Sequence, residues 1–167
     1  MIVLVMGVAG AGKTAIGEPL ARKLGWRFLD ADDHHPPENV AKMKAGIALG
    51  DADRWPWLDQ LNEVLRQHEH AVLACSALKE SYRERLAQGI PDFTVVYLHG
   101  SAALIRTRLE SRQHRYMPAT LLDSQLAALE PPAGAIAMDV AAPLEDCVSA
   151  ILVAVLEKQR LSDLRRA

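Results

Sequence analysis

The octapeptide "GVAGAGKT" at residues 7–14 follows the apolar run "IVLVM" at 2–6 and matches the pattern G-x-x-x-x-G-K-[ST] in full. This pattern predicts a loop between a buried strand and a helix, where glycines let backbone N–H groups surround phosphate oxygens. Lys13 supplies a positive charge for the β- and γ-phosphates, and Thr14 supplies a hydroxyl for Mg²⁺. The predicted nucleotide-binding residues are Gly7, Val8, Ala9, Gly10, Ala11, Gly12, Lys13 and Thr14. The sequence therefore predicts a site for ATP with Mg²⁺.

Short apolar runs and helical periodicity alternate along the rest of the chain. The runs lie at 26–29, 71–75, 94–98 and 135–140, and their lack of polar alternation is typical of strands buried on both faces. Apolar residues spaced by three or four predict helices at 13–24, 57–68, 101–112 and about 143–158. The alternation predicts an α/β fold, with a five-stranded parallel sheet and helices on both faces.

Two details qualify the predicted helices. Pro19 lies inside the first one, and we expect it to kink the helix or to remove a hydrogen bond. The basic tail "QRLSDLRRA" at 159–167 is interpreted as a frayed helix end rather than as a nucleic-acid-binding tail.

The composition narrows the class of protein. A chain of 167 residues suits a single domain spanning 1–167, and a net charge of -2 favours neither nucleic-acid nor membrane-surface binding. No apolar run approaches the roughly 18 residues of a membrane span. Cys75 and Cys147 lie in apolar stretches, which indicates buried thiols in a reducing compartment. We therefore expect a soluble cytoplasmic protein.

The polar cluster "DADDHH" at 30–35 follows the second predicted strand. Ligands of parallel sheets bind beyond the carboxyl ends of the strands, so the cluster is expected beside the nucleotide loop. Asp30 and Asp32 would point the same way in an extended chain. Three interpretations remain open: a catalytic carboxylate with a second carboxylate near Mg²⁺, a zinc site using His34 and His35, or a polar turn. The first is favoured, because adjacent histidines rarely converge on one metal.

Other residues could serve the same edge of the sheet. Asp33 is expected to cap the helix that begins near "PPEN" at 36–39. Arg54, together with Lys79 and Arg83 on one expected helix face, would clamp an anionic, hydroxyl-rich substrate. Ordinary solvated charge is the alternative for these cations.

The segment 106–118, "RTRLESRQHRYMP", places Arg108 and Arg112 four residues apart before a polar break. This arrangement predicts a small helical lid that closes over the nucleotide phosphates and excludes water. The alternative is a solvated helix face.

Two absences separate the classes of nucleotide-binding protein. The run at 71–75 continues into Ser76 rather than an aspartate, and no guanine-reading N-K-x-D is present. Both absences favour a small-molecule kinase over a motor ATPase or a switch GTPase.

The chain resembles the P-loop gluconokinases, relatives of shikimate and adenylate kinases, from about residue 1 to 156. The resemblance is carried by "MGVAGAGKT", "FLDADDHHPPENVAKMKAGIALGDADRWPWL", "CSALKESYRERL", "VVYLHG" and "MPATLLDSQLAALEPP". It implies Mg²⁺-dependent transfer of the ATP γ-phosphoryl group to the 6-hydroxyl of D-gluconate, by a cytoplasmic and often homodimeric enzyme. A shikimate-like kinase and a non-catalytic nucleotide-binding module are the alternatives.

The resemblance also implies roles for individual residues. Asp32 would orient the 6-hydroxyl as a base, and Asp30 would lie in the outer shell of Mg²⁺. The implied catalytic residues are Lys13, Asp32 and Arg112. The implied substrate-binding residues are Asp32, His35, Arg54, Lys79, Arg83 and Gln125. Cys75 would be structural, and Arg108 and Arg112 would contact ATP.

The chain departs from the family pattern just before "YMP". It has His114 and Arg115 where the family usually has Gly-His. Because an arginine is always charged and can reach phosphate oxygens, Arg115 is expected to join the lid arginines and His114 to face solvent. The alternative is that Arg115 is a surface residue and His114 takes the role of the family histidine.

Overall fold

The computed structural model describes residues 1–111 and 122–166, in which five strands form one parallel sheet. The strands are β1 (Ile2–Met6), β2 (Arg27–Asp30), β3 (Ala71–Ala74), β4 (Phe93–His99) and β5 (Ile136–Asp139). Their order is β2-β3-β1-β4-β5, so β1 is central, and Val3 pairs with Val72 on one side and Thr94 on the other. The five-stranded parallel sheet predicted from the apolar runs is confirmed.

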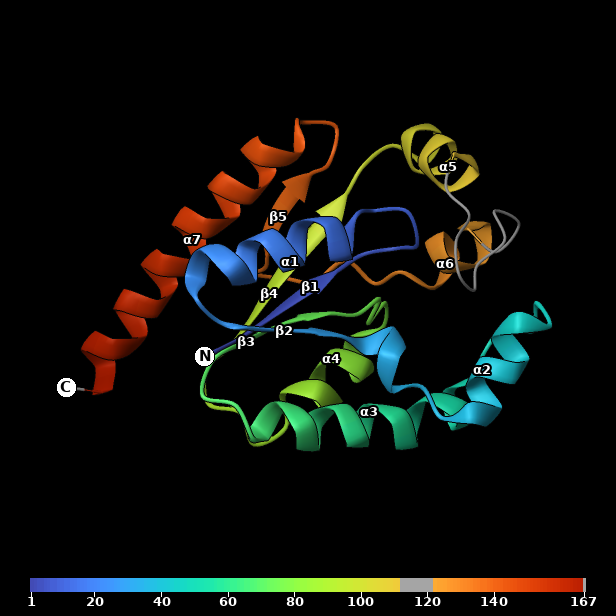
Figure 1. The fold of residues 1–167 in the computed structure, drawn as a ribbon, viewed down its shortest axis with the longest axis horizontal. Helices are drawn as coiled ribbons and strands as arrows, with labels where there is room; N and C mark the ends of the chain where they lie inside the picture. The colour runs from blue at the N-terminus through green and yellow to red at the C-terminus, as the bar shows by residue number, and fades with distance from the viewer. Residues whose placement is uncertain (112–121, 167) are drawn as a thin grey trace.

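Helices cover both faces of this sheet. They are α1 (Lys13–Leu24), α2 (Pro37–Lys44), α3 (Asp51–Arg66), α4 (Glu80–Ala87), α5 (Ala102–Glu110), α6 (Leu122–Ala128) and α7 (Leu144–Arg166), with a short 3₁₀ helix η1 (Ala31–His34). Figure 1 shows α1 and α7 on one face, α3 and α4 on the other, and α2 and α6 beyond the carboxyl ends of the strands.

The core has two halves because the sheet is buried on both faces. Val3 and Val5 of β1 pack in one apolar cluster with α1 and α7. Leu4 and Met6 of the same strand pack in a second cluster with α3 and α4. A strand between two apolar layers needs no polar face, which explains the unbroken apolar runs.

The helix predicted at 57–68 begins six residues earlier, at Asp51. Gly50 takes the N-cap position, and its backbone N–H donates to Asp53 Oδ2 at 3.0 Å. Helices start where such orphan N–H groups find acceptors, so the true start is set by this cap rather than by the first apolar residue.

The last helix also exceeds its predicted range of 143–158 and continues to Arg166, so the described part of the basic tail is helical rather than frayed. Ser162 Oγ donates to Asp92 Oδ1 at 2.5 Å, which ties this end of α7 to the loop before β4. Pro19 lies within α1 without ending it.

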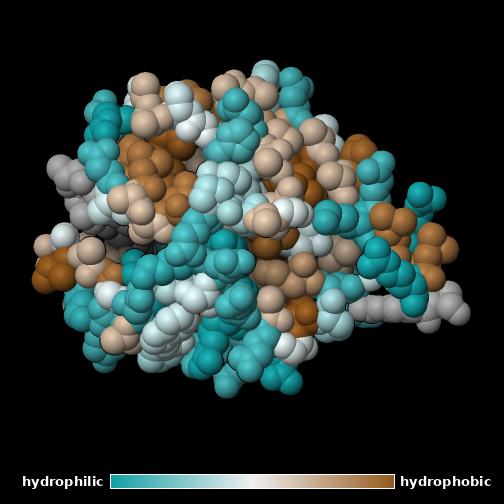
Figure 2. Space-filling view, turned by 180° about the vertical axis from the view of Figure 1, so that it is seen from behind, coloured by the Kyte–Doolittle hydropathy of each residue, from teal (hydrophilic) through white to brown (hydrophobic). Residues whose placement is uncertain are grey.

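The surface seen in Figure 2 mixes charged and apolar side chains, and apolar groups are visible at several places on this face. Leu161 and Leu164 near the end of α7 are among the exposed large apolar residues. Among the helices of the described residues, none combines the length and apolar character needed to cross a bilayer.

Candidate active site

The loop between β1 and α1 is closely packed against neighbouring elements. At Gly7 an added Cβ would lie 2.7 Å from the carbonyl oxygen of Leu98. At Gly10, which has a φ of +82°, it would lie 2.8 Å from Leu109 Cγ of α5. Both glycines are therefore required by close contacts, and the loop delivers its N–H groups to the start of α1.

Lys13 is the first residue of α1, and its Nζ donates to the carbonyl of Val8 at 3.2 Å. Burial lowers the pKa of Lys13, while the nearby Asp32, Cys75 and Asp30 oppose this shift. The ammonium group is therefore held against the phosphate loop, with two carboxylates close by.

Asp30 links the end of β2 to this loop. Its Oδ2 accepts a hydrogen bond from Thr14 Oγ1 at 2.9 Å, and its Oδ1 accepts from the Asp32 N–H at 3.1 Å. A hydroxyl and a carboxylate side by side suit a hard divalent cation, which prefers oxygen ligands. Asp30 thereby caps η1, so the expectation that the chain is extended through Asp32 is wrong.

Two further points about this cluster concern the helix cap expected from Asp33 and the alternative of a zinc site. The N-cap position of α2 is occupied by Pro36, and Asp33 lies within η1, so Asp33 is not the N-cap residue of α2 as expected. Across residues 1–111 and 122–166, no three His, Cys, Asp or Glu side chains are grouped to hold a metal ion.

His35 is enclosed by aromatic and polar neighbours. Its ring stacks on Trp57 with centroids 4.0 Å apart, and its side chain is only 4% exposed. Its Nε2 lies 3.9 Å from Asp32 Oδ1, and its Nδ1 has no hydrogen-bond partner within the described part of the chain. Burial, aided by Arg54, lowers the pKa of His35 to about 4, so the ring is neutral at pH 7.

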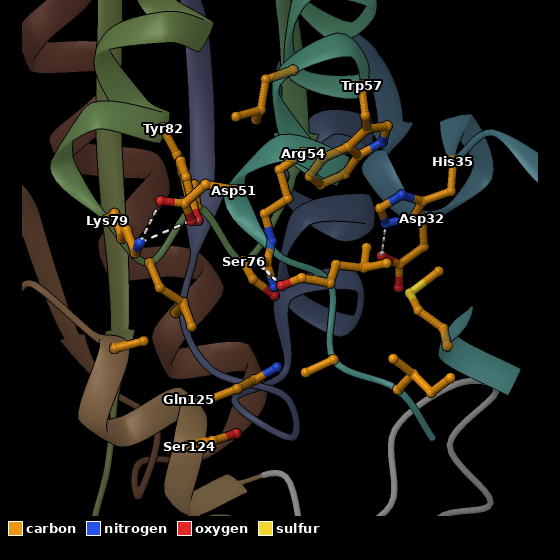
Figure 3. A pocket seen from close by; sticks show the side chains of 18 residues that line it. Asp32, His35, Asp51, Arg54, Trp57, Ser76, Lys79, Tyr82, Ser124 and Gln125 are labelled. Atoms are coloured by element: carbon orange, nitrogen blue, oxygen red, sulfur yellow. Dashed lines mark hydrogen bonds and ion pairs between the residues drawn. The ribbon is translucent and has the colours of Figure 1, made fainter. Parts of the chain in front are cut away.

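A pocket of about 330 Å³ lies at this edge of the sheet. Figure 3 shows Asp32 and His35 on one side of it, Lys79 and Asp51 on the other, and Arg54 between them. A cavity of this size fits a small polar metabolite.

Asp51 organises the Lys79 side of the pocket. Lys79 Nζ donates to both carboxylate oxygens of Asp51 at 2.8 Å, and Tyr82 donates its hydroxyl hydrogen to the same carboxylate. These hydrogen bonds lower the pKa of Asp51. Nearby, Arg54 donates to the carbonyl of Leu49, which fixes one edge of its guanidinium. The residues assigned to the site from the sequence do not include Asp51 and Tyr82, because their contact with Lys79 is a tertiary one.

Arg83 lies elsewhere than expected. Lys79 is the N-cap of α4 rather than part of the helix, so the two cations do not share a helix face. Arg83 is buried and is absent from the pocket lining. Its guanidinium donates to the carbonyls of Ala77 and Leu78 at 3.0 Å each. Ala77 has a φ of +41°, so Arg83 supports a strained turn that lines the pocket.

The segment that follows β4 is only partly described. Gln125 of α6 lines the pocket, and its Oε1 accepts from the Ala9 N–H at 2.7 Å. Arg108 of α5 donates to the carbonyl of Val140, just after β5. The rest of the expected lid lies outside the described residues, including Arg112, His114 and Arg115.

Comparisons with known proteins agree with this geometry. The shikimate kinase family model matches residues 9–128. A probable gluconokinase from Xenopus tropicalis is 45% identical, over 90% of this chain and 91% of the relative, and a gluconokinase from Gluconobacter oxydans is 48% identical, over 77% and 75%. The crystal structure of a gluconokinase from Sinorhizobium meliloti is 42% identical and superimposes with a TM-score of 0.86, covering 96% of this chain and 95% of that one. The chain belongs to the gluconokinase family of P-loop kinases.

Membership of the gluconokinase family makes this chain an ATP-dependent kinase that works with a divalent metal. The side-chain oxygens of Thr14 and Asp30 lie directly beside the phosphate loop and are suitable for binding this metal. Cys75, at the end of β3, is buried, and burial raises the pKa of its thiol to about 12. At neutral pH the thiol is protonated and is a poor nucleophile.

Proposed function

We propose that this kinase transfers the γ-phosphoryl group of ATP, in the presence of Mg²⁺, to the 6-hydroxyl of D-gluconate, giving 6-phospho-D-gluconate. The observation that carries the proposal is the pocket with Asp32 on one side, Lys79 on the other and Arg54 between them. A linear sugar acid has its terminal hydroxyl and its carboxylate at opposite ends, so its hydroxyl can approach Asp32 while its carboxylate approaches Arg54 and the Lys79 ammonium, which also pairs with Asp51. The names of the relatives support the same substrate.

In the proposed reaction, Asp32 accepts the proton of the 6-hydroxyl. The hydroxyl oxygen forms a bond to the γ-phosphorus as the bond between that phosphorus and the bridging oxygen of ADP breaks. Lys13 and the N–H groups of the loop stabilise the charge that develops on the phosphate oxygens. Thr14 and Asp30 would hold Mg²⁺, which when bound further neutralises the phosphates.

The cation Arg54 supports selection of an acid over a neutral sugar. The neutral ring of His35 suits the hydroxyl groups of such a substrate. Glucose lacks the carboxylate, so Arg54 would have no substrate carboxylate to bind. A polar site rejects an analogue that leaves its buried groups unpaired much more strongly than an apolar site rejects a missing methylene.

A coupled assay with D-gluconate, D-glucose and shikimate tests the proposal. We expect gluconate to have a kcat/KM at least about 100-fold above that of glucose, since the charge pairing is lost. Asp32→Asn should lower kcat by about 100-fold or more with a near-normal KM for ATP. The matched control is Asp33→Asn, the same change one residue further along η1 and outside the pocket lining, which should leave kcat near the wild-type value. Equal use of gluconate and glucose, or preference for shikimate, would contradict the assignment.

Three further properties are part of the proposal. The enzyme is cytoplasmic, which agrees with its two free, buried cysteines. It is a homodimer, as its resemblance to the family implies, and each chain is a single domain over residues 1–167.

A further inference from the structure

Gln125 contacts the phosphate loop and the acceptor pocket at the same time. It projects from α6 and lines the pocket, while its Oε1 accepts from the Ala9 N–H at 2.7 Å across 116 residues of sequence. Ala9 lies inside "GVAGAGKT" and is buried. One side chain therefore bridges the two sites that the transferred phosphoryl group must link.

The chemistry of the amide fixes which end faces which site. A backbone N–H can only donate, so the Gln125 carbonyl oxygen must face Ala9. The NH₂ group then points the other way, and it carries two donors and no acceptor. Figure 3 shows this nitrogen end directed into the pocket, below Arg54 and Ser76. A hydroxylated acid in the pocket offers oxygen acceptors to such a group.

The shape of the loop is fixed by the Lys13 hydrogen bond to the Val8 carbonyl and by contacts from neighbouring elements. Gly10 packs against Leu109 of α5 without room for a Cβ. Gln125 holds the neighbouring Ala9 from α6. The first half of the loop is therefore set by contacts from β4, α5 and α6, and the contact from α6 extends into the acceptor pocket.

We propose that Gln125 is a positioning residue that couples the nucleotide site to the acceptor site. Its Oε1 holds the phosphate loop through the Ala9 N–H, and its Nε2 donates to an oxygen of the acceptor. An acceptor bound to the amide restrains the loop, and a loop occupied by nucleotide restrains the amide, so each ligand strengthens binding of the other. The acceptor half of this inference rests on the proposed function, whereas the loop half does not.

Two substitutions at Gln125 separate its two hydrogen bonds. Gln125→Glu keeps an oxygen acceptor for Ala9 but replaces the NH₂ donors with a second carboxylate oxygen, which repels an acid. Gln125→Leu keeps approximate size and removes both bonds. Gln125→Asn, one methylene shorter, is a second test of the loop contact if the leucine variant unfolds. Matched controls are Gln67→Glu and Gln67→Leu, at an exposed residue that ends α3 at the opposite edge of the sheet.

The measurement is the dissociation constant of gluconate by titration calorimetry, with and without a non-hydrolysable ATP analogue and Mg²⁺. Wild-type protein should bind gluconate about 5-fold or more tightly when the analogue is present, which is the usual range of coupling between sites. Gln125→Leu should reduce this ratio to about 1 and also weaken binding of the analogue alone. Gln125→Glu should weaken gluconate by about 10-fold and the analogue by less than gluconate, because its hydrogen bond to the loop is kept.

Several results would overturn the inference: a wild-type ratio near 1, a wild-type ratio retained in Gln125→Leu, or equal losses for both ligands in Gln125→Glu. Failure of the proposed function gives a different pattern. If the wild-type enzyme prefers another acid, the ratio is measured with that acid. The effect of Gln125→Leu on the ATP analogue alone needs no acceptor, so it tests the loop contact in either case.

Discussion

His35 is an ionisable ring that the fold keeps neutral. It stacks on Trp57, and its side chain is almost fully buried. The charged groups that face it are Asp32, whose carboxylate is 3.9 Å away, and Arg54, which disfavours a second positive charge. Its pKa falls from 6.5 to about 4, and burial is the larger cause. Protonation of this ring therefore opposes folding.

The consequence is a specific pH dependence of stability. Between pH 6.5 and about 4 the unfolded chain takes up a proton at His35 and the folded chain does not, so the free energy of unfolding falls as the pH falls. At about 1.4 kcal/mol for each pKa unit, the loss attributable to this ring is at most about 3.5 kcal/mol. Urea unfolding at pH 7 and pH 4.5 should show a smaller loss for His35→Asn than for wild type.

His34→Asn is the matched control, because it makes the same change at the neighbouring residue and should retain the wild-type dependence. The carboxyl groups of Asp51, Asp53 and Asp59 do not account for the change in stability between pH 7 and pH 4.5. Hydrogen bonds lower their pKa values below 3.8, so the stability they contribute is lost only at lower pH. A full pH dependence retained in His35→Asn would contradict the assignment.

At the scale of elements, the turn between β3 and α4 is held by contacts from outside the pocket. Arg83 donates to the carbonyls of Ala77 and Leu78. Glu130 donates its N–H to the Leu78 carbonyl at 2.9 Å and accepts from the Glu80 N–H, the first of α4, at 2.6 Å. The turn can therefore keep a positive φ at Ala77 and present its polar groups to the pocket.

Arg83 and Arg85 provide a paired test on the same helix. Arg83→Ala removes the guanidinium donor of the Ala77 carbonyl and one of the two donors of the Leu78 carbonyl, which keeps the Glu130 N–H, and should cost roughly 1–3 kcal/mol of stability. It should also raise the KM for the acceptor, because the turn that precedes Lys79 is released. Arg85→Ala removes an ion pair with Asp59, in which both side chains are over 40% exposed, and should cost less than about 1 kcal/mol. Urea unfolding and acceptor kinetics measure both effects; similar losses in the two variants would show that the turn does not depend on Arg83.

The positions of these elements explain which features the sequence could predict. Apolar runs report burial directly, so the sheet and the phosphate loop followed from local pattern alone. The spacing of Lys79 and Arg83 gave a shared face only on the assumption that the helix had already begun at Lys79, whereas it begins at Glu80. Spacing indicates a face only inside an element, and element ends are where local pattern is weakest.

The active-site cluster shows a second limit. Asp30 and Asp32 were treated as extended, but the Asp30 carboxylate accepts from the Asp32 N–H and turns the chain into η1. Asp51 meets Lys79 across 28 residues of sequence, and nothing in the local pattern reports that contact. The sequence therefore predicted that these charged residues lie beyond the carboxyl ends of the strands, whereas tertiary contacts decide which of them pair with one another.

At the scale of the whole molecule, the sheet joins two apolar cores into one body. Trp26 packs against the cluster that includes α1 and α7, whereas Trp57 is buried in the cluster that includes α3 and α4. Neighbouring residues of β1, such as Val3 and Leu4, belong to different clusters. Loss of either cluster would expose one face of every central strand, so neither half of the core can unfold without the other.

We therefore predict a single cooperative unfolding transition for the ligand-free chain. The tryptophans allow each half to be followed separately: Trp55→Phe with Trp57→Phe leaves Trp26 as the only reporter, and Trp26→Phe with Trp55→Phe leaves Trp57. In each variant, urea unfolding followed by tryptophan fluorescence should have the same midpoint and slope as unfolding followed by far-ultraviolet circular dichroism. Comparison within one variant matters, because Trp57→Phe removes the hydrogen bond to the Ala31 carbonyl and shifts the midpoint itself. Ligands must be absent, since nucleotide would stabilise the folded state by mass action. A Trp26 transition that separates from the dichroism of the same protein would show that the two cores unfold independently and that residues 1–167 are not one cooperative domain.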